Sequence, residues 1–202
     1  QPLAWTAGNA LEVNEAVSFL TGDERHARLA TVVEELSAEL LLLGGLAASA
    51  EESRQKVRDS LDSGRAAEKF AAMVTAQGGP TNLLEHPELF LPAAAIARPV
   101  FPARAGYVSA IDARAMGMVV IALGGGRQRV EDPIDPSVGI SQISGVGARV
   151  DTNTPLAFIH ASTEDDWDRA AQLLSDAYTI GGDAVEVRPA IYAQVEGKST
   201  HE

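Results

Sequence analysis

The glycine run at residues 124–126, followed by Arg127, is the first part of the sequence whose residue types could do chemistry. Glycines let a backbone approach an anion closely, and an arginine adds a charge-assisted contact. The run lacks both the Lys-Ser/Thr pair of a P-loop and the G-x-G-x-x-G spacing of a dinucleotide-binding turn. We therefore favour a helix C-cap followed by a tight turn over an anion site.

Three carboxylates follow in the segment 131–136, at Glu131, Asp132 and Asp135. Carboxylate oxygens suit a divalent cation, but a calcium loop needs a longer series of oxygen ligands and a glycine at its turn. Both aspartates precede a proline, a position where Asx turns often begin. The sequence therefore favours a solvated loop over a metal site.

The four histidines, at positions 26, 86, 160 and 201, include no pair at metal-ligand spacing. His160 ends an apolar segment, and we favour a buried, hydrogen-bonded structural role for it. The chain has no cysteine and no G-x-S-x-G nucleophile elbow, so thiolate sites, disulfides and this form of serine catalysis are excluded. These motifs predict no catalytic and no substrate-binding residue.

The composition limits the class of protein. The chain has 202 residues, of which 46% are hydrophobic and 22% charged, as in soluble proteins with a sizeable core. A net charge of −12 disfavours nucleic acid as a partner, because an acidic surface repels phosphates. No apolar run has the length of a membrane span, and no secretory signal opens the chain. We expect a cytoplasmic protein without a membrane partner.

Residues 1–77 have the apolar spacing of helices. Apolar residues three and four positions apart predict helices over 12–20, 26–43 and 65–77. A capping box from Ser49 to Glu52 opens one more helix, which Gly64 ends. The apolar stripe of the second helix consists of Leu29, Val32, Val33, Leu36, Leu40 and Leu43. We therefore predict a helical layer.

The amino-acid pattern changes after residue 77. Five prolines between positions 80 and 102 exclude long regular elements, so residues 78–105 are predicted to be an extended connector. Residues 106–196 form an α+β module, and residues 197–202 form a tail. The module's predicted strands cover 106–111, 138–140, 148–150, 155–160 and 185–195, and its predicted helices cover 112–123 and 163–178. The predicted fold class is α+β.

Three separated segments together resemble one enzyme family. The first contains Gln1-Pro2-Leu3, Gly8-Asn9-Ala10-Leu11-Glu12-Val13 and Glu15-Ala16; the second runs from Gly106-Tyr107-Val108 through Asp112, Arg114, Ala115 and Gly117 to Leu123-Gly124-Gly125-Gly126-Arg127; the third contains Asp132, Ile134-Asp135 and Val138-Gly139. In this order and spacing they are similar to thymidine phosphorylase and the related pyrimidine-nucleoside phosphorylases. The likeness runs from residue 1 to about residue 195.

The resemblance implies that the chain is the C-terminal half of a longer α/β enzyme. Residues 1–77 would be the last helices of its α/β domain, and residues 106–196 its C-terminal module with a barrel-sandwich-like sheet. The parent, a homodimer by family, would convert thymidine or deoxyuridine and phosphate into free base and 2-deoxy-D-ribose 1-phosphate. The glycine loop that holds phosphate and the residues that bind the pyrimidine lie in the missing N-terminal half. We therefore expect the isolated chain to be inactive.

The resemblance also implies a potassium site, although no cofactor is required. The family's ligands fall on Leu3 and Thr6, which would supply backbone carbonyls, and on Glu15, which would supply a carboxylate. Oxygen ligands suit such a hard cation. The remaining ligands belong to the missing phosphate loop, so binding to the isolated chain is expected to be weak or absent. The alternative for Glu15 is an exposed helix carboxylate.

Two alternatives remain open. The first is a parent phosphorylase of broader pyrimidine specificity, because the residues that decide specificity are not in this chain. The C-terminal module also resembles biotinyl and lipoyl carrier domains, which present a modifiable lysine on an exposed hairpin. Lys56 and Lys69 fall in predicted helices and Lys198 in the tail, which argues against a carrier. A helical layer without its partner strands is expected to expose apolar surface and to self-associate.

Overall fold

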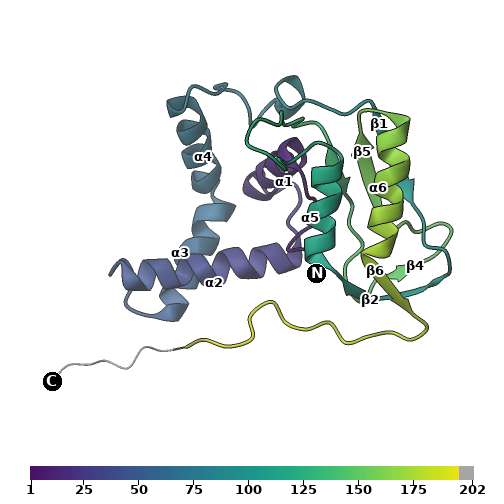
Figure 1. Cartoon of the computed structure of the whole chain (residues 1–202). Helices are drawn as coiled ribbons and strands as arrows, with labels where there is room; N and C mark the ends of the chain where they lie inside the picture. The colour runs from purple at the N-terminus through teal and green to yellow at the C-terminus, as the bar shows by residue number, and fades with distance from the viewer. Residues whose placement is uncertain (196–202) are drawn as a thin grey trace.

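The computed structural model describes residues 1–195 and begins with four helices (Figure 1). These helices are α1 (Asn9–Thr21), α2 (Ala27–Leu43), α3 (Ala50–Asp62) and α4 (Arg65–Ala76). All four predicted helices are confirmed, although α1 begins three residues before the predicted start. Helix α4 packs against both α3 and α1, and so connects the α2–α3 pair to the rest of the molecule.

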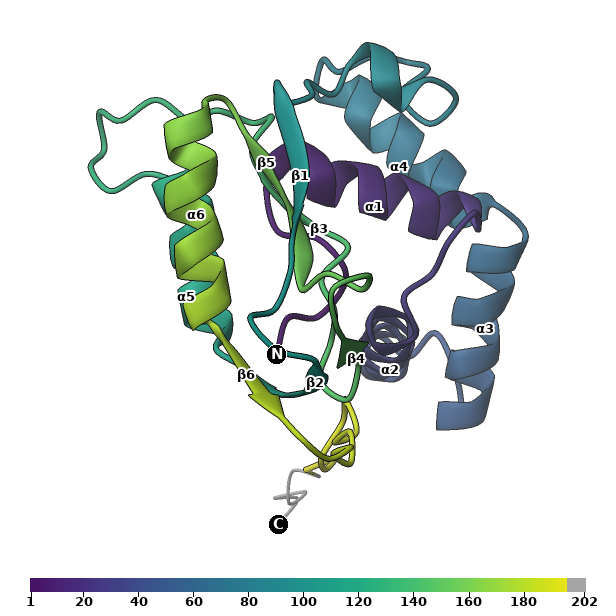
Figure 2. The same cartoon turned by 90° about the vertical axis from the view of Figure 1, so that its right-hand side faces the viewer.

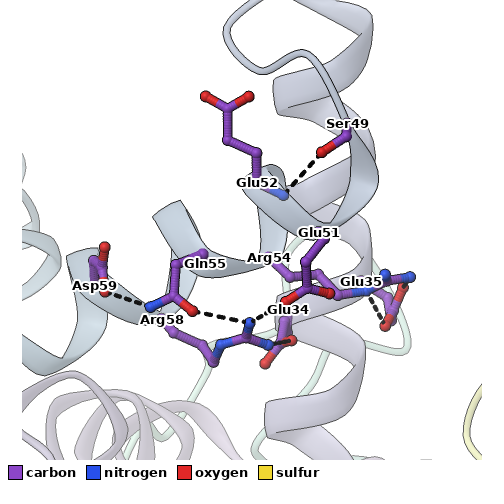
Figure 3. Close-up of polar contacts among 9 residues, drawn as sticks. All are labelled: Glu34, Glu35, Ser49, Glu51, Glu52, Arg54, Gln55, Arg58 and Asp59. Carbon is purple, nitrogen blue, oxygen red and sulfur yellow. Dashed lines mark hydrogen bonds and ion pairs between the residues drawn. The ribbon is translucent and has the colours of Figure 1, made fainter.

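The helix starts follow from local capping. The His26 ring nitrogen accepts a hydrogen bond from the Arg28 N–H at the start of α2. The predicted capping box opens α3, since the Glu52 N–H donates to the Ser49 hydroxyl at 3.2 Å (Figure 3). The Glu52 carboxylate accepts in return from the Ala48 N–H at 2.8 Å. These contacts satisfy donors that a helix start otherwise leaves unpaired.

Ion pairs hold α2 and α3 together as a hairpin (Figure 3). Arg54 donates from two nitrogens to the two oxygens of Glu35, each at 2.9 Å. Arg58 pairs with Glu34 at 2.6 Å. The hydrogen bond from Arg54 holds the pKa of Glu35 below its usual range. These pairs fix which side of α2 faces α3.

The proline-rich segment contains only short elements, as predicted. They are a 3-10 helix at Pro87–Leu89 and a strand, β1, at Ile96–Val100. The sequence did not predict β1, because Pro99 lies inside it and a proline cannot donate to a sheet. The strand tolerates the proline because β1 lies at the edge of its sheet.

The following residues form two small antiparallel sheets with two helices (Figure 2). The elements are β2 (Gly106–Ile111), α5 (Ala113–Ala122), β3 (Gly139–Ser141), β4 (Arg149–Val150), β5 (Ala157–Ala161), α6 (Glu164–Asp176) and β6 (Tyr178–Gly181). The strand orders are β1-β5-β3 and β4-β2-β6. Helices α5 and α6 pack on each other, and α6 covers β5 and β1. With the helices of residues 1–77, this is the predicted α+β class.

The core lies between the sheets and the helices α5 and α6. Its fully buried members include Val108, Val119, Ile140, Val150, Leu156, Ile159 and Leu174. Strand β2 departs from simple alternation, because a register shift between Val108 and Ala110 against β6 puts Val108 and Ile111 both in the core. Bulges of this kind re-aim the side chains that follow them.

The predicted last strand at 185–195 is wrong. The last strand is β6, which pairs with β2, and residues 182–195 belong to no sheet. The predicted helix 163–178 includes Tyr178, whereas α6 ends at Asp176 and Tyr178 begins β6. The segment 182–195 instead runs along α2 (Figure 1). There Gln194 donates to Glu39 at 2.6 Å and Arg28 donates to the Arg188 carbonyl at 3.5 Å.

Candidate functional site

A cavity of about 840 Å³ lies between α1 and the segment 141–145 that follows β3. Helix α1 contributes four residues of one face: Leu11, Asn14, Glu15 and Ser18. The other walls consist of Trp5, Thr6, Glu24, Ser141, Gln142, Ile143, Ser144, Gly145, Ala148 and His160. A cavity lined by several converging polar groups is the default candidate for a ligand site.

The Glu15 carboxylate is the most connected group of this cavity. It accepts from the Trp5 N–H at 3.0 Å and from the Thr6 N–H at 3.1 Å. The Thr6 hydroxyl also donates to it. Since Glu15 is half-buried, these donors replace the water that the carboxylate loses. Glu15 is therefore not an exposed helix carboxylate, the alternative that the sequence left open.

Strand β3 fixes the loop that carries Thr6. Ala7 and Ile140 exchange two backbone hydrogen bonds, of 2.9 and 2.7 Å. The Ile143 N–H donates to the Trp5 carbonyl at 3.0 Å. Gly8 follows with φ +137°, and a Cβ there would lie 2.6 Å from the Val138 carbonyl oxygen. The glycine thus lets the loop backbone approach Val138 closely, and this approach places Thr6 beside Glu15.

The structure brings together two of the three residues predicted to bind potassium. Thr6 and Glu15 both line the cavity and contact each other. Leu3 is 43% exposed and does not line it. Within residues 1–195, no hydrogen bond reaches the carbonyl oxygens of Leu3 and Thr6, which leaves both able to act as ligands. The ligand role of these three residues stays a prediction.

His160 is a hydrogen-bonded residue, as favoured, but it is only partly buried. Its Nε2 lies 2.8 Å from the Ser141 hydroxyl, on the neighbouring strand of the same sheet. Burial lowers the pKa of His160, so the ring is neutral at pH 7. Beside this pair, Gln142 has φ +50°, the one positive value among the non-glycine residues of the described chain. The sequence showed no signal for this conformation.

The glycine run forms a helix C-cap, as favoured. Gly124 has φ +92°, and its N–H donates to the Ile121 carbonyl at 3.0 Å. The Gly125 N–H donates to the Val120 carbonyl at 2.9 Å, which completes a Schellman motif. The Asn9 side chain donates to the Gly125 carbonyl at 2.9 Å and ties this cap to α1. Arg127 is exposed.

Asp135 forms the Asx turn that the sequence favours, whereas Asp132 accepts from a residue before it and forms no such turn. Asp132 accepts from the Arg129 N–H at 2.8 Å, and Asp135 accepts from the Ser137 N–H at 2.9 Å. The Ser137 and Ser162 hydroxyls also donate to Asp135, and the pKa of this carboxyl is lowered by these hydrogen bonds. In the part of the chain that the structure describes, no three His, Asp or Glu side chains are grouped as metal ligands.

The lysines and other histidines do not assemble a site in the described residues. Lys56 lies in α3 and Lys69 in α4, as predicted, so neither occupies the β-hairpin that a carrier domain uses. His26 caps α2, and its ring contacts the Trp5 ring edge-on. Lys198 and His201 lie outside the described residues. Among residues 1–195, no helix combines the length and apolarity that a membrane crossing requires.

The cavity chemistry excludes one class of ligand. Its wall carries two carboxylates, Glu15 and Glu24, and no lysine or arginine. A phosphate group in this cavity would meet like charge without a cationic partner. The described chain therefore presents a cavity of mixed polar and apolar lining that favours neutral or cationic groups.

Comparison with known families matches residues 107–181 to the C-terminal domain of pyrimidine nucleoside phosphorylase. The matched segment begins in β2, includes α5 and its glycine cap, and ends with β6. It therefore covers both three-stranded sheets except β1, together with the two helices that pack on them. Residues 107–181 of this chain are thus similar to the C-terminal domain of pyrimidine nucleoside phosphorylase.

Proposed function

We propose that the chain is the C-terminal portion of a thymidine phosphorylase, a cytoplasmic homodimeric enzyme of pyrimidine nucleoside salvage. The observation that carries the proposal is the domain at 107–181. The segments Gln1-Pro2-Leu3 and Gly8–Val13, whose likeness to the family lies outside that domain, add support. The reaction breaks the glycosidic C–N bond and forms a C–O bond from phosphate to the anomeric carbon. The base leaves with a proton, and 2-deoxy-D-ribose 1-phosphate remains.

The chain alone is proposed to be inactive. Phosphorolysis needs cationic donors that hold phosphate and stabilise the charge that develops on the sugar. The cavity beside α1 has two carboxylates and no lysine or arginine in its wall. Arg127, the cation nearest the family's glycine run, is exposed on the loop after α5. We propose that this half of the enzyme supports a phosphate site, and that other residues of the enzyme bind the phosphate.

Potassium is proposed as a structural ion of the intact enzyme. Glu15 supplies a carboxylate that three donors already orient, and the Leu3 and Thr6 carbonyls are without hydrogen bonds within residues 1–195. This set of hard oxygen ligands fits a monovalent cation. A bound ion would neutralise the charge of Glu15 and add to the contacts that already hold the loop carrying Thr6. The loop would then offer a surface of fixed conformation to the half of the enzyme that binds the substrate.

The test compares two proteins: the purified 202-residue chain and the product of its natural gene. Thymine release from thymidine is followed with and without phosphate, and uridine serves as the second substrate. The proposal expects no release by the chain and phosphate-dependent release from thymidine, not uridine, by the gene product. Circular dichroism on the chain ensures that a lack of activity reflects a missing site rather than unfolding.

Each other outcome has a defined meaning. Phosphate-dependent turnover by the chain alone would overturn its assignment as an inactive portion. Cleavage of uridine as well as thymidine by the gene product would replace thymidine specificity with the broader pyrimidine specificity. A biotin or lipoyl adduct in the mass spectrum would favour the carrier alternative.

A further inference from the structure

Ser141 and His160 form a pair in the wall of the cavity beside α1. The Ser141 hydroxyl lies 2.8 Å from the His160 Nε2, and both residues line the cavity. Ser141 ends β3 and His160 lies in β5, the neighbouring strand of the same sheet. A hydroxyl within hydrogen-bond reach of an imidazole is the arrangement of an activated nucleophile and its base. Neither the contacts of Glu15 nor the proposed phosphorolysis uses this pair.

The His160 ring has the protonation state that a base requires. Burial lowers the pKa of His160, so the ring is neutral at pH 7 and Nε2 can accept the hydroxyl proton. The carboxylates of the cavity, Glu15 and Glu24, make no hydrogen bond to the ring in the described chain. Without a carboxylate partner, the pair is a dyad rather than a triad, and we expect it to turn over slowly.

Gln142, the residue after Ser141, supplies a third component. Its φ of +50° turns the backbone sharply at the end of β3, and strained residues of this kind gather at functional sites. Within residues 1–195, the Gln142 N–H makes no hydrogen bond. The N–H that follows a nucleophilic serine is one of the two donors to the oxyanion in α/β-hydrolases. Gln142 also lines the cavity, so its N–H is available for this role.

We propose that Ser141 and His160 are a nucleophile and its base, and that they hydrolyse carboxylic esters that carry no negative charge. The Ser141 oxygen attacks the ester carbonyl carbon while its proton passes to the His160 Nε2. The bond to the alcohol oxygen then breaks, and the alcohol leaves with that proton. Water attacks the acyl-serine next, giving a proton to the same nitrogen. The carboxylic acid leaves, and the proton returns to the serine oxygen.

The charges of the cavity define the substrate class. Its wall contains the carboxylates Glu15 and Glu24 and no lysine or arginine, so an anionic ester would meet like charge. Trp5 lies in the same wall and offers an aromatic ring, which a cationic group can contact favourably. Neutral and cationic esters are therefore the expected substrates.

The first test is covalent labelling of the 202-residue chain with a neutral fluorophosphonate ester. A serine oxygen–phosphorus bond forms, and fluoride leaves with the serine proton. Peptide mapping by mass spectrometry should place the adduct on Ser141 in the folded chain and find none after unfolding in urea. His160→Gln should abolish labelling, because the amide keeps a hydrogen bond to Ser141 but cannot accept its proton.

Ser162→Ala is the matched control. Ser162 is exposed, and its hydroxyl donates to the Asp135 carboxylate rather than to an imidazole. This variant should therefore be labelled as fast as the unsubstituted chain. Circular dichroism on every variant separates a lost base from a lost fold.

The second test is hydrolysis of para-nitrophenyl acetate. Ser141→Ala and His160→Gln should each lower the rate above background by at least about tenfold. The substrate class is tested with meta-acetoxyphenyl trimethylammonium and meta-acetoxybenzoate, each relative to its spontaneous hydrolysis. The cationic ester should be favoured by about tenfold.

The remaining outcomes would overturn the proposal in defined parts. A folded chain without an adduct on Ser141, or labelling that survives His160→Gln, would refute the nucleophile and its base. Labelling without ester turnover would refute hydrolysis. Equal relative rates for the cationic and anionic esters would refute the substrate class.

Discussion

Thr6 donates to Glu15 through both its backbone N–H and its hydroxyl, across nine residues of sequence. This double contact clamps the loop before α1 onto the helix. The loop also pairs with β3 through Ala7 and Ile140. The first residues of the chain are thereby attached to both the helical part and the sheet, and one wall of the cavity is fixed.

Glu15→Gln should lower the free energy of unfolding by about 1.5–3 kcal/mol. The amide keeps one acceptor oxygen, but its NH₂ group would face the donors of Trp5 and Thr6. Urea unfolding at pH 7 measures the change. Glu24→Gln is the matched control, because Glu24 is an exposed glutamate in the wall of the same cavity. An equal effect of both substitutions would contradict the clamp.

Potassium dependence should appear in the product of the natural gene and be weak or absent in the 202-residue chain. A cation that binds only the folded state raises the melting temperature by mass action. Melting curves in potassium chloride and choline chloride at equal ionic strength make the comparison. Glu15→Gln should abolish the difference, whereas Thr6→Ala should keep it because a carbonyl ligand survives the change. Identical curves for the unsubstituted gene product would remove potassium from the proposal.

Stability should fall as the pH decreases from about 7 to 5.5. The pKa of His160 is lowered by burial from its usual 6.5, and the pKa of His26 is lowered mainly by burial as well. The unfolded chain therefore binds protons near pH 6.5 that the folded chain takes up only at lower pH, which favours unfolding there. Urea unfolding at several pH values tests this dependence.

His160→Gln identifies the part of the pH dependence that belongs to this residue. The glutamine amide can still hydrogen-bond to Ser141 but does not titrate, so the slope between pH 7 and 5.5 should become smaller. His26, whose pKa is also lowered mainly by burial, should contribute to the residual slope. A variant that keeps the full slope would show that His160 does not contribute.

Gly124→Ala should destabilise the protein by about 1–2 kcal/mol, because a left-handed residue with a Cβ is strained. Gly124 has φ +92° in the cap of α5. Gly117 lies inside the same helix with open space around its Cβ position, so Gly117→Ala should be stabilising by about 0.5–1 kcal/mol. Thermal melting of both variants should give shifts of opposite sign. A shift of the same sign would contradict the cap geometry.

Local patterns determined most helices and their ends. Ser49 caps α3 as predicted, and the helices predicted to begin at Asp112 and Thr163 begin one residue later with those two residues as N-caps, because capping depends only on residues within one turn. The glycine cap after α5 and the Asx turn at Asp135 before β3 were equally predictable, since both depend on backbone geometry close to the residue.

Strand pairing was decided only by the tertiary structure. Strand β1 contains Pro99, which cannot donate a backbone hydrogen bond. The strand is possible because it lies at the edge of its sheet, with β5 on one side and no strand of the described chain on the other. The segment 185–195 has the alternation of a strand but finds no partner edge among the described residues, so its pattern alone could not make a sheet. A strand needs hydrogen bonds from distant residues, and the sequence does not say which residues will be there.

The sequence by itself determined the α+β class, the cap of α3, the glycine cap of α5 and a resemblance that the family match confirms for residues 107–181. Only the tertiary structure brought Ser141 and His160 to the cavity of Thr6 and Glu15 and left Leu36, Leu40 and Leu43 outside the core. The apolar spacing of α2 predicts a buried stripe, but spacing gives the face of a helix and not its neighbour. Burial depends on what packs against the face, and that is a property of the whole fold.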